Sequence, residues 1–242
     1  MDISQLILTA MAALIALTIH EYAHGYVAYK LGDDTAKSQD RLSLNPMKHL
    51  DPFGVICMVL FHFGWARPVP INPRNFKNPR KGFALTALAG PGINLIVGFF
   101  TAFFYLLCLA IFKPSENVFL YNLQLNTIRF FYFFFTVNVG LAIFNLIPVP
   151  PFDGSRILNV ILPERIYFKV MQYERQIYWG VIAWLFLGDV VYATLLKIPF
   201  IANVPVLKAI FKIFSLSDIL SEAISAIANA MLSFWQLIPM LA

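Results

Sequence analysis

Four apolar stretches of this 242-residue chain are each long enough to cross a lipid bilayer as a helix. They cover residues 3–31, 83–112, 128–147 and 177–196. Because lipid cannot hydrogen-bond to a backbone, a chain that crosses the hydrocarbon layer in such stretches must be helical there. Hydrophobic residues make up 59% of the chain and charged residues 13%, roughly half the charged share of a soluble domain. The sequence therefore predicts an all-α polytopic membrane protein.

A fifth apolar stretch, residues 53–65, is too short to cross the bilayer. Downstream of it, Pro68-Val69-Pro70 cannot form a regular helix. We therefore expect a re-entrant or extended segment near residues 53–73. Its extended backbone either pairs with an unwound substrate by strand addition or lies as a plain loop against the lipid headgroups.

The C-terminal part of the chain has a helical periodicity of its own. Apolar residues between 219 and 235 keep helical spacing and are opposed by serines and an asparagine. This pattern predicts an amphipathic helix on the membrane or against the bundle, with a further span as the alternative. We expect one integral membrane domain over residues 1–242, with its core in 1–160 and a C-terminal span and amphipathic helix in 177–242.

The first apolar stretch carries the sequence His20-Glu21-Tyr22-Ala23-His24. On a helix, residues four apart lie on one face, so both imidazoles can reach one metal ion, with Glu21 beside them to activate a water molecule. The chain has only four histidines, and ionisable groups at membrane depth are costly and usually functional. This spacing predicts a zinc site, the alternative being a polar cluster that caps or cross-links a buried helix.

A histidine pair of this kind needs a third protein ligand, and Asp153 is the best-placed candidate. It follows the third long stretch, where prolines end the helix and Gly154 permits a tight turn that aims the carboxylate back into the bundle. The alternative role is that of a turn or capping aspartate. His49 and His62 have no helical spacing to the histidine pair and are weaker candidates.

These motifs together resemble the signature of the site-2 protease family, which consists of intramembrane zinc metalloproteases. The resemblance is carried by HEYAH at 20–24, AGPGIN at 89–94 and NLIPVPPFDG at 145–154, and FGWARPVPINP at 63–73 is similar to short bacterial members. It implies a three-helix catalytic core with one zinc ion per chain. It also implies His20, His24 and Asp153 as the zinc ligands and Glu21 as the general base.

Two asparagines are candidate donors to the oxyanion that forms during peptide hydrolysis. Asn94 and Asn145 are amides within otherwise apolar stretches, and such an oxyanion needs a donor besides the metal. We prefer Asn145, because it lies eight positions before Asp153 at the end of the same stretch. Hydrogen bonding between helices is an equally good interpretation for Asn94 and the better one for Asn138.

Basic residues predict the orientation of the chain in a cell membrane. Lysines and arginines gather between the first and second long stretches and between the third and fourth, whereas the remaining loop offers only Lys113, with Arg129 at a helix edge. By the positive-inside rule, the N-terminus lies outside and the site lies toward the cytoplasm, provided that residues 53–65 do not cross. The net charge of +5 thus reports orientation, and we expect no nucleic acid partner.

The sequence accordingly predicts an intramembrane zinc endopeptidase whose partners are the lipid bilayer and transmembrane protein substrates. Two other functions remain open, a metal-transit protein and a catalytically inactive membrane adaptor. Transporters usually show inverted repeats, which this sequence lacks, and a transit site has no specific need for Glu21.

Overall fold

The computed structural model describes residues 2–54, 66–212 and 215–241. Regular structure in these residues is helical, apart from an isolated antiparallel bridge between Leu50 and Ala66. The all-α prediction is confirmed. The apolar part of the predicted re-entrant segment, from residue 55 to residue 65, lies outside the described residues.

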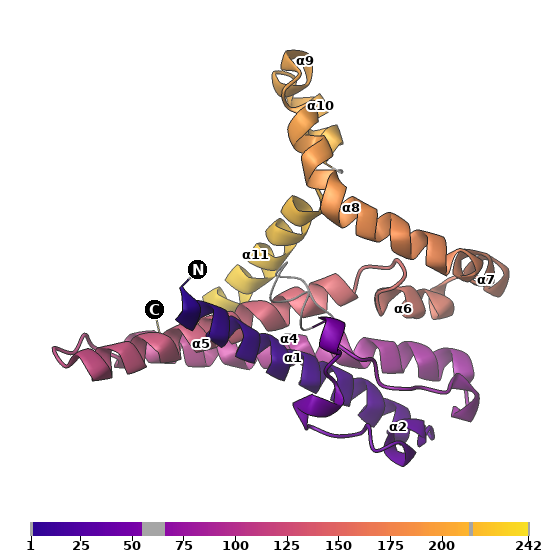
Figure 1. Cartoon of the computed structure of the whole chain (residues 1–242), viewed down its shortest axis with the longest axis horizontal. Helices are drawn as coiled ribbons and strands as arrows, with labels where there is room; N and C mark the ends of the chain where they lie inside the picture. Colours follow the sequence, from indigo (N-terminus) through magenta and orange to yellow (C-terminus); the bar gives the residue numbers. More distant parts are fainter. Residues whose placement is uncertain (1, 55–65, 213–214, 242) are drawn as a thin grey trace.

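Three long helices form the core of the molecule (Figure 1). They are α1 (Ile3–Lys30), α4 (Pro79–Ile111) and α5 (Val118–Asn145), and each is long and apolar enough to cross a membrane. The third helix begins ten residues before the predicted 128, because the Asn117 side chain accepts hydrogen bonds from the first free N–H groups and caps the helix there. The predicted membrane-spanning core is therefore present.

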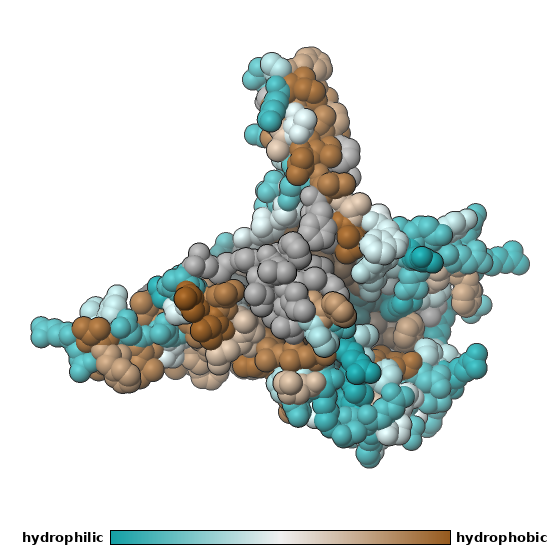
Figure 2. All heavy atoms as spheres, in the orientation of Figure 1, coloured by the Kyte–Doolittle hydropathy of each residue, from teal (hydrophilic) through white to brown (hydrophobic). Residues whose placement is uncertain are grey.

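Small residues allow the three helices to approach one another closely. Ala12, Ala16 and Ala28 of α1 are buried, and a β-carbon at Gly98 of α4 would lie 3.1 Å from Val139 of α5. Figure 2 shows hydrophobic residues along the flanks of the bundle and hydrophilic residues at its ends, most of all around α2 (Thr35–Ser38). The bundle thus presents an apolar surface to lipid and polar surfaces to water.

Between α1 and α4, the described residues 31–54 and 66–78 form turns and short helices, which we call the polar layer. The chain turns sharply after α1 at Gly32, whose φ is +107°. Glycine suits this position because residues with a side chain rarely adopt that conformation. The layer then continues through α2 and two short 3-10 turns, η1 (Pro46–Lys48) and η2 (Pro73–Asn75). It ends where the Asn78 side chain caps α4. This layer covers the end of α1 that carries the histidine pair.

The chain after α5 first returns to the bundle and then leaves it. The helices are α6 (Gly154–Ile161), α7 (Glu164–Gln172), α8 (Glu174–Leu195), α9 (Pro199–Ala202), α10 (Pro205–Phe211) and α11 (Leu216–Trp235). Helices α8 to α10 project from the bundle as an arm (Figure 1). The predicted span at 177–196 corresponds to α8, which is bent by 51° and qualifies as a span only if both of its halves are taken together.

Helix α11 turns back from this arm and packs against α4 and α5. Its Ala228 joins Ala102, Phe135 and Val139 in a buried apolar cluster, and the indole N–H of Trp235 donates to the α4 backbone at 2.8 Å. The amphipathic helix, which the sequence predicts to lie either on the membrane or against the bundle, lies against the bundle as α11.

Candidate metal centre

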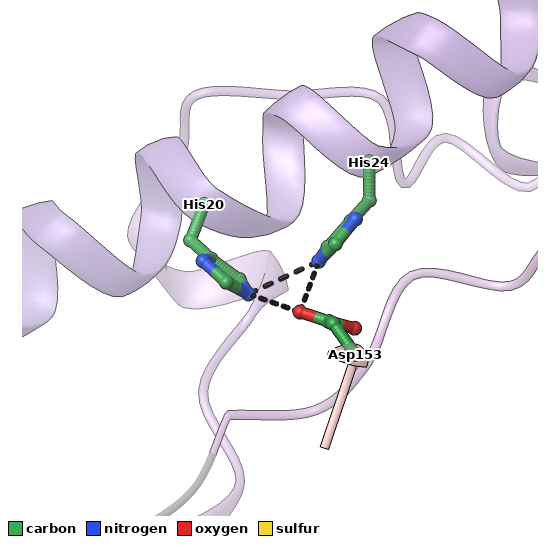
Figure 3. Close-up of side chains that lie close together, drawn as sticks. All are labelled: His20, His24 and Asp153. Atoms are coloured by element: carbon green, nitrogen blue, oxygen red, sulfur yellow. Dashed lines mark hydrogen bonds and ion pairs between the residues drawn. The ribbon is translucent and has the colours of Figure 1, made fainter. Parts of the chain in front are cut away.

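His20, His24 and Asp153 meet between α1 and the loop that follows α5 (Figure 3). The Nε2 atoms of the two histidines are 3.0 Å apart, and Oδ2 of Asp153 lies 3.2 Å from the first and 3.1 Å from the second. Both histidines are buried, with 4% and 5% of their surface exposed. The three residues that the sequence singles out as metal ligands are thus brought together although Asp153 is more than 100 positions from the pair.

A backbone carbonyl sets the hydrogen position on His24. Its Nδ1 atom lies 2.7 Å from the carbonyl oxygen of Thr86 in α4. Because a carbonyl only accepts, Nδ1 of His24 must carry the hydrogen and donate it. In the neutral imidazole, Nε2 then has a free lone pair directed at the cluster.

A chain of amides sets the hydrogen position on His20. Asn138 donates from Nδ2 to the Phe134 carbonyl at 2.7 Å, so its Oδ1 faces Asn94. Asn94 donates from Nδ2 to that oxygen at 2.7 Å and to the Ala16 carbonyl at 3.3 Å. Its own Oδ1, 2.6 Å from Nδ1 of His20, must therefore accept the hydrogen of the imidazole. Nε2 of His20 is left with a lone pair as well.

Three lone pairs consequently converge on one point when both imidazoles are neutral, and they would repel one another without a metal ion or a proton between them. Oδ2 of Asp153 is buried and accepts no hydrogen bond from the described residues. Ligand atoms about 2.0–2.1 Å from a tetrahedral zinc ion are about 3.3 Å apart, close to the 3.0–3.2 Å spacing of these three atoms. The residues therefore fit a zinc ion that keeps a fourth position for water or substrate.

Glycine at position 90 provides the space for this cluster. A β-carbon there would lie 2.4 Å from Nε2 of His24 and 2.5 Å from Cε1 of His20. The backbone of α4 therefore forms one wall of the site, next to Pro91, which removes a hydrogen bond from the helix. From the sequence, the glycines at this point indicate only a close approach of helices.

The Asp153 carboxylate is positioned by the turn between α5 and α6. A β-carbon at Gly154 would lie 2.4 Å from the carbonyl oxygen of Leu146 and 2.5 Å from that of Ile147, so the chain can fold back on itself only with glycine there. The hydroxyl of Ser155 is buried and donates to the Phe152 carbonyl at 2.7 Å. This turn directs Asp153 toward α1.

Glu21 lies on α1 beside the cluster, and one of its oxygens is held by the polar layer. The backbone N–H of Val69 donates to Oε2 of Glu21 at 2.9 Å. This contact joins residues 48 positions apart, and no feature of the sequence pattern points to it.

Among the described residues, the remaining candidates form no hydrogen bond or ion pair with His20, His24 or Asp153. Asn145 donates from Nδ2 to the Leu141 carbonyl of its own helix at 3.0 Å, and among the described residues it has no hydrogen bond to the three clustered side chains. Nε2 of His49 is 2.6 Å from the Ser43 carbonyl, outside the cluster. His62 lies in the part of the chain that the structure does not describe.

The cluster lies within the part of the chain that matches a known protein family. The sequence model for peptidase family M50 matches residues 8–188, a range that contains both histidines, Glu21 and Asp153. No solved structure is found to match the chain.

Several curated proteins are similar in sequence. The chain is 47% identical over 161 residues to "Putative zinc metalloprotease YwhC" of Bacillus subtilis, an alignment that covers 66% of this chain and 72% of that protein. It is 26% identical over 153 residues to "Putative zinc metalloprotease Rip2" of Mycolicibacterium smegmatis, covering 61% of this chain and 54% of the relative. "Zinc metalloprotease MJ0392" of Methanocaldococcus jannaschii is 28% identical over 151 residues, or 62% of this chain and 33% of that protein.

Proposed function

The chain belongs to peptidase family M50, and on that premise we propose that it is an intramembrane zinc endopeptidase. It hydrolyses peptide bonds in or near the transmembrane segments of other membrane proteins. The observation that carries this proposal is the convergence of three lone pairs on one point within an apolar helix bundle, beside a glutamate. The family assignment and the named relatives support the same chemistry.

Each residue of the cluster has a defined part in this reaction. His20, His24 and Asp153 hold one zinc ion per chain. Zinc, when bound there, polarises the scissile carbonyl and acidifies the attacking water. Glu21 accepts the proton of that water and passes it to the leaving amine, as the neighbouring glutamate does in other sites with this spacing.

The two asparagines take different parts. Both amide hydrogens of Asn94 are used by Ala16 and Asn138, and its oxygen accepts from His20, so we replace the expected oxyanion role with that of a positioning residue for the ligand. Asn145 uses one amide hydrogen in its own helix, and the other makes no hydrogen bond within the described residues. It remains the proposed donor to the oxyanion.

The location of the cluster indicates the class of substrate. His20 lies well inside α1, which is apolar enough to span the membrane. A peptide reaches the cluster only if it enters the membrane or its boundary, so transmembrane segments that unwind readily are the natural substrates. The distribution of basic residues supports an outside N-terminus and a site toward the cytoplasm.

A reconstituted assay tests the proposal. The purified protein is placed in liposomes with tagged single-span membrane proteins whose spans contain glycine or proline, and fragments are followed on gels. We expect cleavage by the wild type, loss of cleavage on chelation, and its return with zinc.

The Glu21→Gln variant separates the proposed functions in the same assay. It should not cleave, yet it should hold about one zinc ion per chain, because the metal ligands are unchanged. Cleavage by this variant would contradict the general-base role. A zinc-loaded wild type that cuts no substrate would instead favour the inactive adaptor.

A further inference from the structure

The extended backbone at residues 66–70 forms hydrogen bonds with the rest of the polar layer on the N-terminal side of Val69, the residue that contacts Glu21. The N–H of Arg67 donates to the carbonyl of His49 at 2.7 Å. The Nη2 atom of Arg41 donates to the carbonyl of Arg67 at 2.8 Å and to that of Pro68 at 3.2 Å. These three hydrogen bonds fix the direction of the first half of the segment.

Val69 supplies the one backbone N–H between residues 68 and 70, because its two neighbours are prolines. That N–H is directed at Oε2 of Glu21. The prolines also prevent this extended backbone from presenting unpaired donors to an apolar environment. Since the donors of Arg67 and Val69 are both used within the protein, neither is free to pair with a substrate strand in this conformation.

The Val69 side chain fits directly onto α1. It is 6% exposed, and a β-carbon at Gly25 would stand 3.1 Å from its Cγ1 atom. Gly25 follows the second histidine of the pair, so the segment contacts the helix beside the metal ligands. A larger residue at position 25 would push Val69, and its N–H with it, away from Glu21.

On the C-terminal side of Val69, the chain forms hydrogen bonds with Asp33 in the turn after α1. Asp33, which is fully buried, accepts hydrogen bonds from the N–H of Asn72 at 2.7 Å and from Nδ2 of Asn75 at 2.7 Å. The segment is therefore hydrogen-bonded to the rest of the polar layer on both sides of Val69.

Arg41 stabilises the segment by donating hydrogen bonds to the backbone carbonyls of Arg67 and Pro68. It forms no ion pair with the described residues. Burial lowers the pKa of its guanidinium, the Arg67 cation adds to this effect, and the Glu21 carboxylate opposes it. Arginine nevertheless stays protonated in proteins, so Arg41 places a permanent positive charge within electrostatic reach of Glu21.

From these contacts we propose that Arg41 is a positioning residue for the hydrolytic reaction. By holding the carbonyls of Arg67 and Pro68, it keeps the Val69 N–H on one oxygen of Glu21, so that the other oxygen is oriented toward the attacking water. This inference rests on the proposed function. It requires that loss of the Arg41 contacts lowers kcat while KM and zinc content stay the same.

The first test compares Arg41→Gln, Arg41→Lys and the control Arg74→Gln, which removes an exposed cation whose guanidinium makes no hydrogen bond or ion pair within the described residues. Zinc content, kcat and KM are measured with the substrate found in the reconstituted assay. Arg41→Gln should lower kcat about 10- to 100-fold, as expected for a misaligned catalytic group. Arg41→Lys should recover part of this loss, and Arg74→Gln should behave as the wild type.

A second pair of variants tests the hydrogen bond without altering Arg41. Val69→Pro removes the N–H and keeps the backbone extended, whereas Val69→Ala removes only part of the side chain. The proline variant should lose kcat as Arg41→Gln does, and the alanine variant should retain most of it. This pair keeps the proposal testable if Arg41→Gln fails to fold.

A thiol probe reports the position of the segment independently of catalysis. The Val69→Cys substitution is made in a chain whose Cys57 and Cys108 are replaced by serine. Its thiol should react with a maleimide several-fold faster when the chain also carries Arg41→Gln, because the released segment exposes position 69.

The outcomes separate this inference from the proposed function. A wild type without protease activity overturns both. An active wild type overturns the inference alone in any of four cases: Arg41→Gln keeps full kcat, Val69→Pro keeps full kcat, Arg41→Gln loses zinc together with activity, or the maleimide labelling of the Val69→Cys variant does not change.

Discussion

The backbone of Gly90 lies so close to His24 that a β-carbon at position 90 would stand 2.4 Å from the Nε2 atom. His24 cannot withdraw from such an atom, because its Nδ1 is hydrogen-bonded to the α4 backbone. One turn of α4 therefore holds His24 at Nδ1 through the Thr86 carbonyl and, with glycine at position 90, leaves space for its Nε2 atom. Gly90 is therefore required by the arrangement of the two imidazoles in the proposed metal site as well as by helix packing.

We accordingly predict that Gly90→Ala loses most of its zinc, because the added methyl group overlaps both imidazoles. Elemental analysis of the purified protein measures this directly. Gly92→Ala is the matched control, since a β-carbon at that position meets nothing within 4 Å. Near-stoichiometric zinc in Gly90→Ala would show that the site can open, and our account of this wall of the site would be wrong.

The hydrogen bond between Asn94 and His20 leads to a second prediction. Asn94→Ala leaves the Nδ1 hydrogen of His20 without its acceptor, and loss of such an outer contact typically weakens metal binding about 10- to 100-fold. Competition with a graded series of zinc chelators measures the affinity. If Asn94→Ala instead kept its zinc affinity and lost only kcat, the oxyanion role expected from the sequence would be the better interpretation.

Much of the fold and the metal cluster could be predicted because the signals are local. Hydrophobic length identifies α1 and α4, a spacing of four residues identifies His20 and His24, and a proline-rich turn with glycine identifies Asp153. Each depends on residues within about one helix or one turn. The polar residues at the start of α5 weaken the same signal, and its first ten residues were therefore missed.

The contacts that surround the cluster depend on tertiary structure and have no local signal. Asn94 reaches His20 across 74 positions, and Val69 reaches Glu21 across 48. An amide in an apolar helix is equally consistent with catalysis and with helix packing until its partners are known. The bonds to Ala16 and Asn138 favour helix packing and positioning for Asn94, and only the assembled bundle brings these residues together.

Asp153 as a metal ligand leads to a third prediction. Asp153→Asn keeps the shape of the side chain but removes the negative charge, and a neutral amide is a poor zinc ligand. We expect most of the zinc to be lost in elemental analysis. Asp34→Asn, at an exposed position, makes the same change of charge and should bind zinc normally. Zinc retained by Asp153→Asn would require a different third ligand.

The buried Asp33 carboxylate makes the stability of the polar layer dependent on pH. Burial raises the pKa of this group, but hydrogen bonds from Thr35, Asn72 and Asn75 outweigh burial and hold the pKa below its ordinary value. A lowered pKa means that the folded state prefers the charged form. The stabilisation is therefore complete above the unfolded value of about 3.9 and is lost as the pH falls toward the folded value.

We predict that Asp33→Asn lowers the free energy of unfolding at pH 7 by about 1.5–3 kcal/mol, the usual range for hydrogen bonds to a charged group. The difference in melting temperature between wild type and variant, measured in detergent, should shrink as the pH falls below about 4. The shrinkage follows because protonation removes from the wild type the charge that the variant already lacks. An equal difference at about pH 7 and about pH 3 would mean that the Asp33 charge does not contribute to stability.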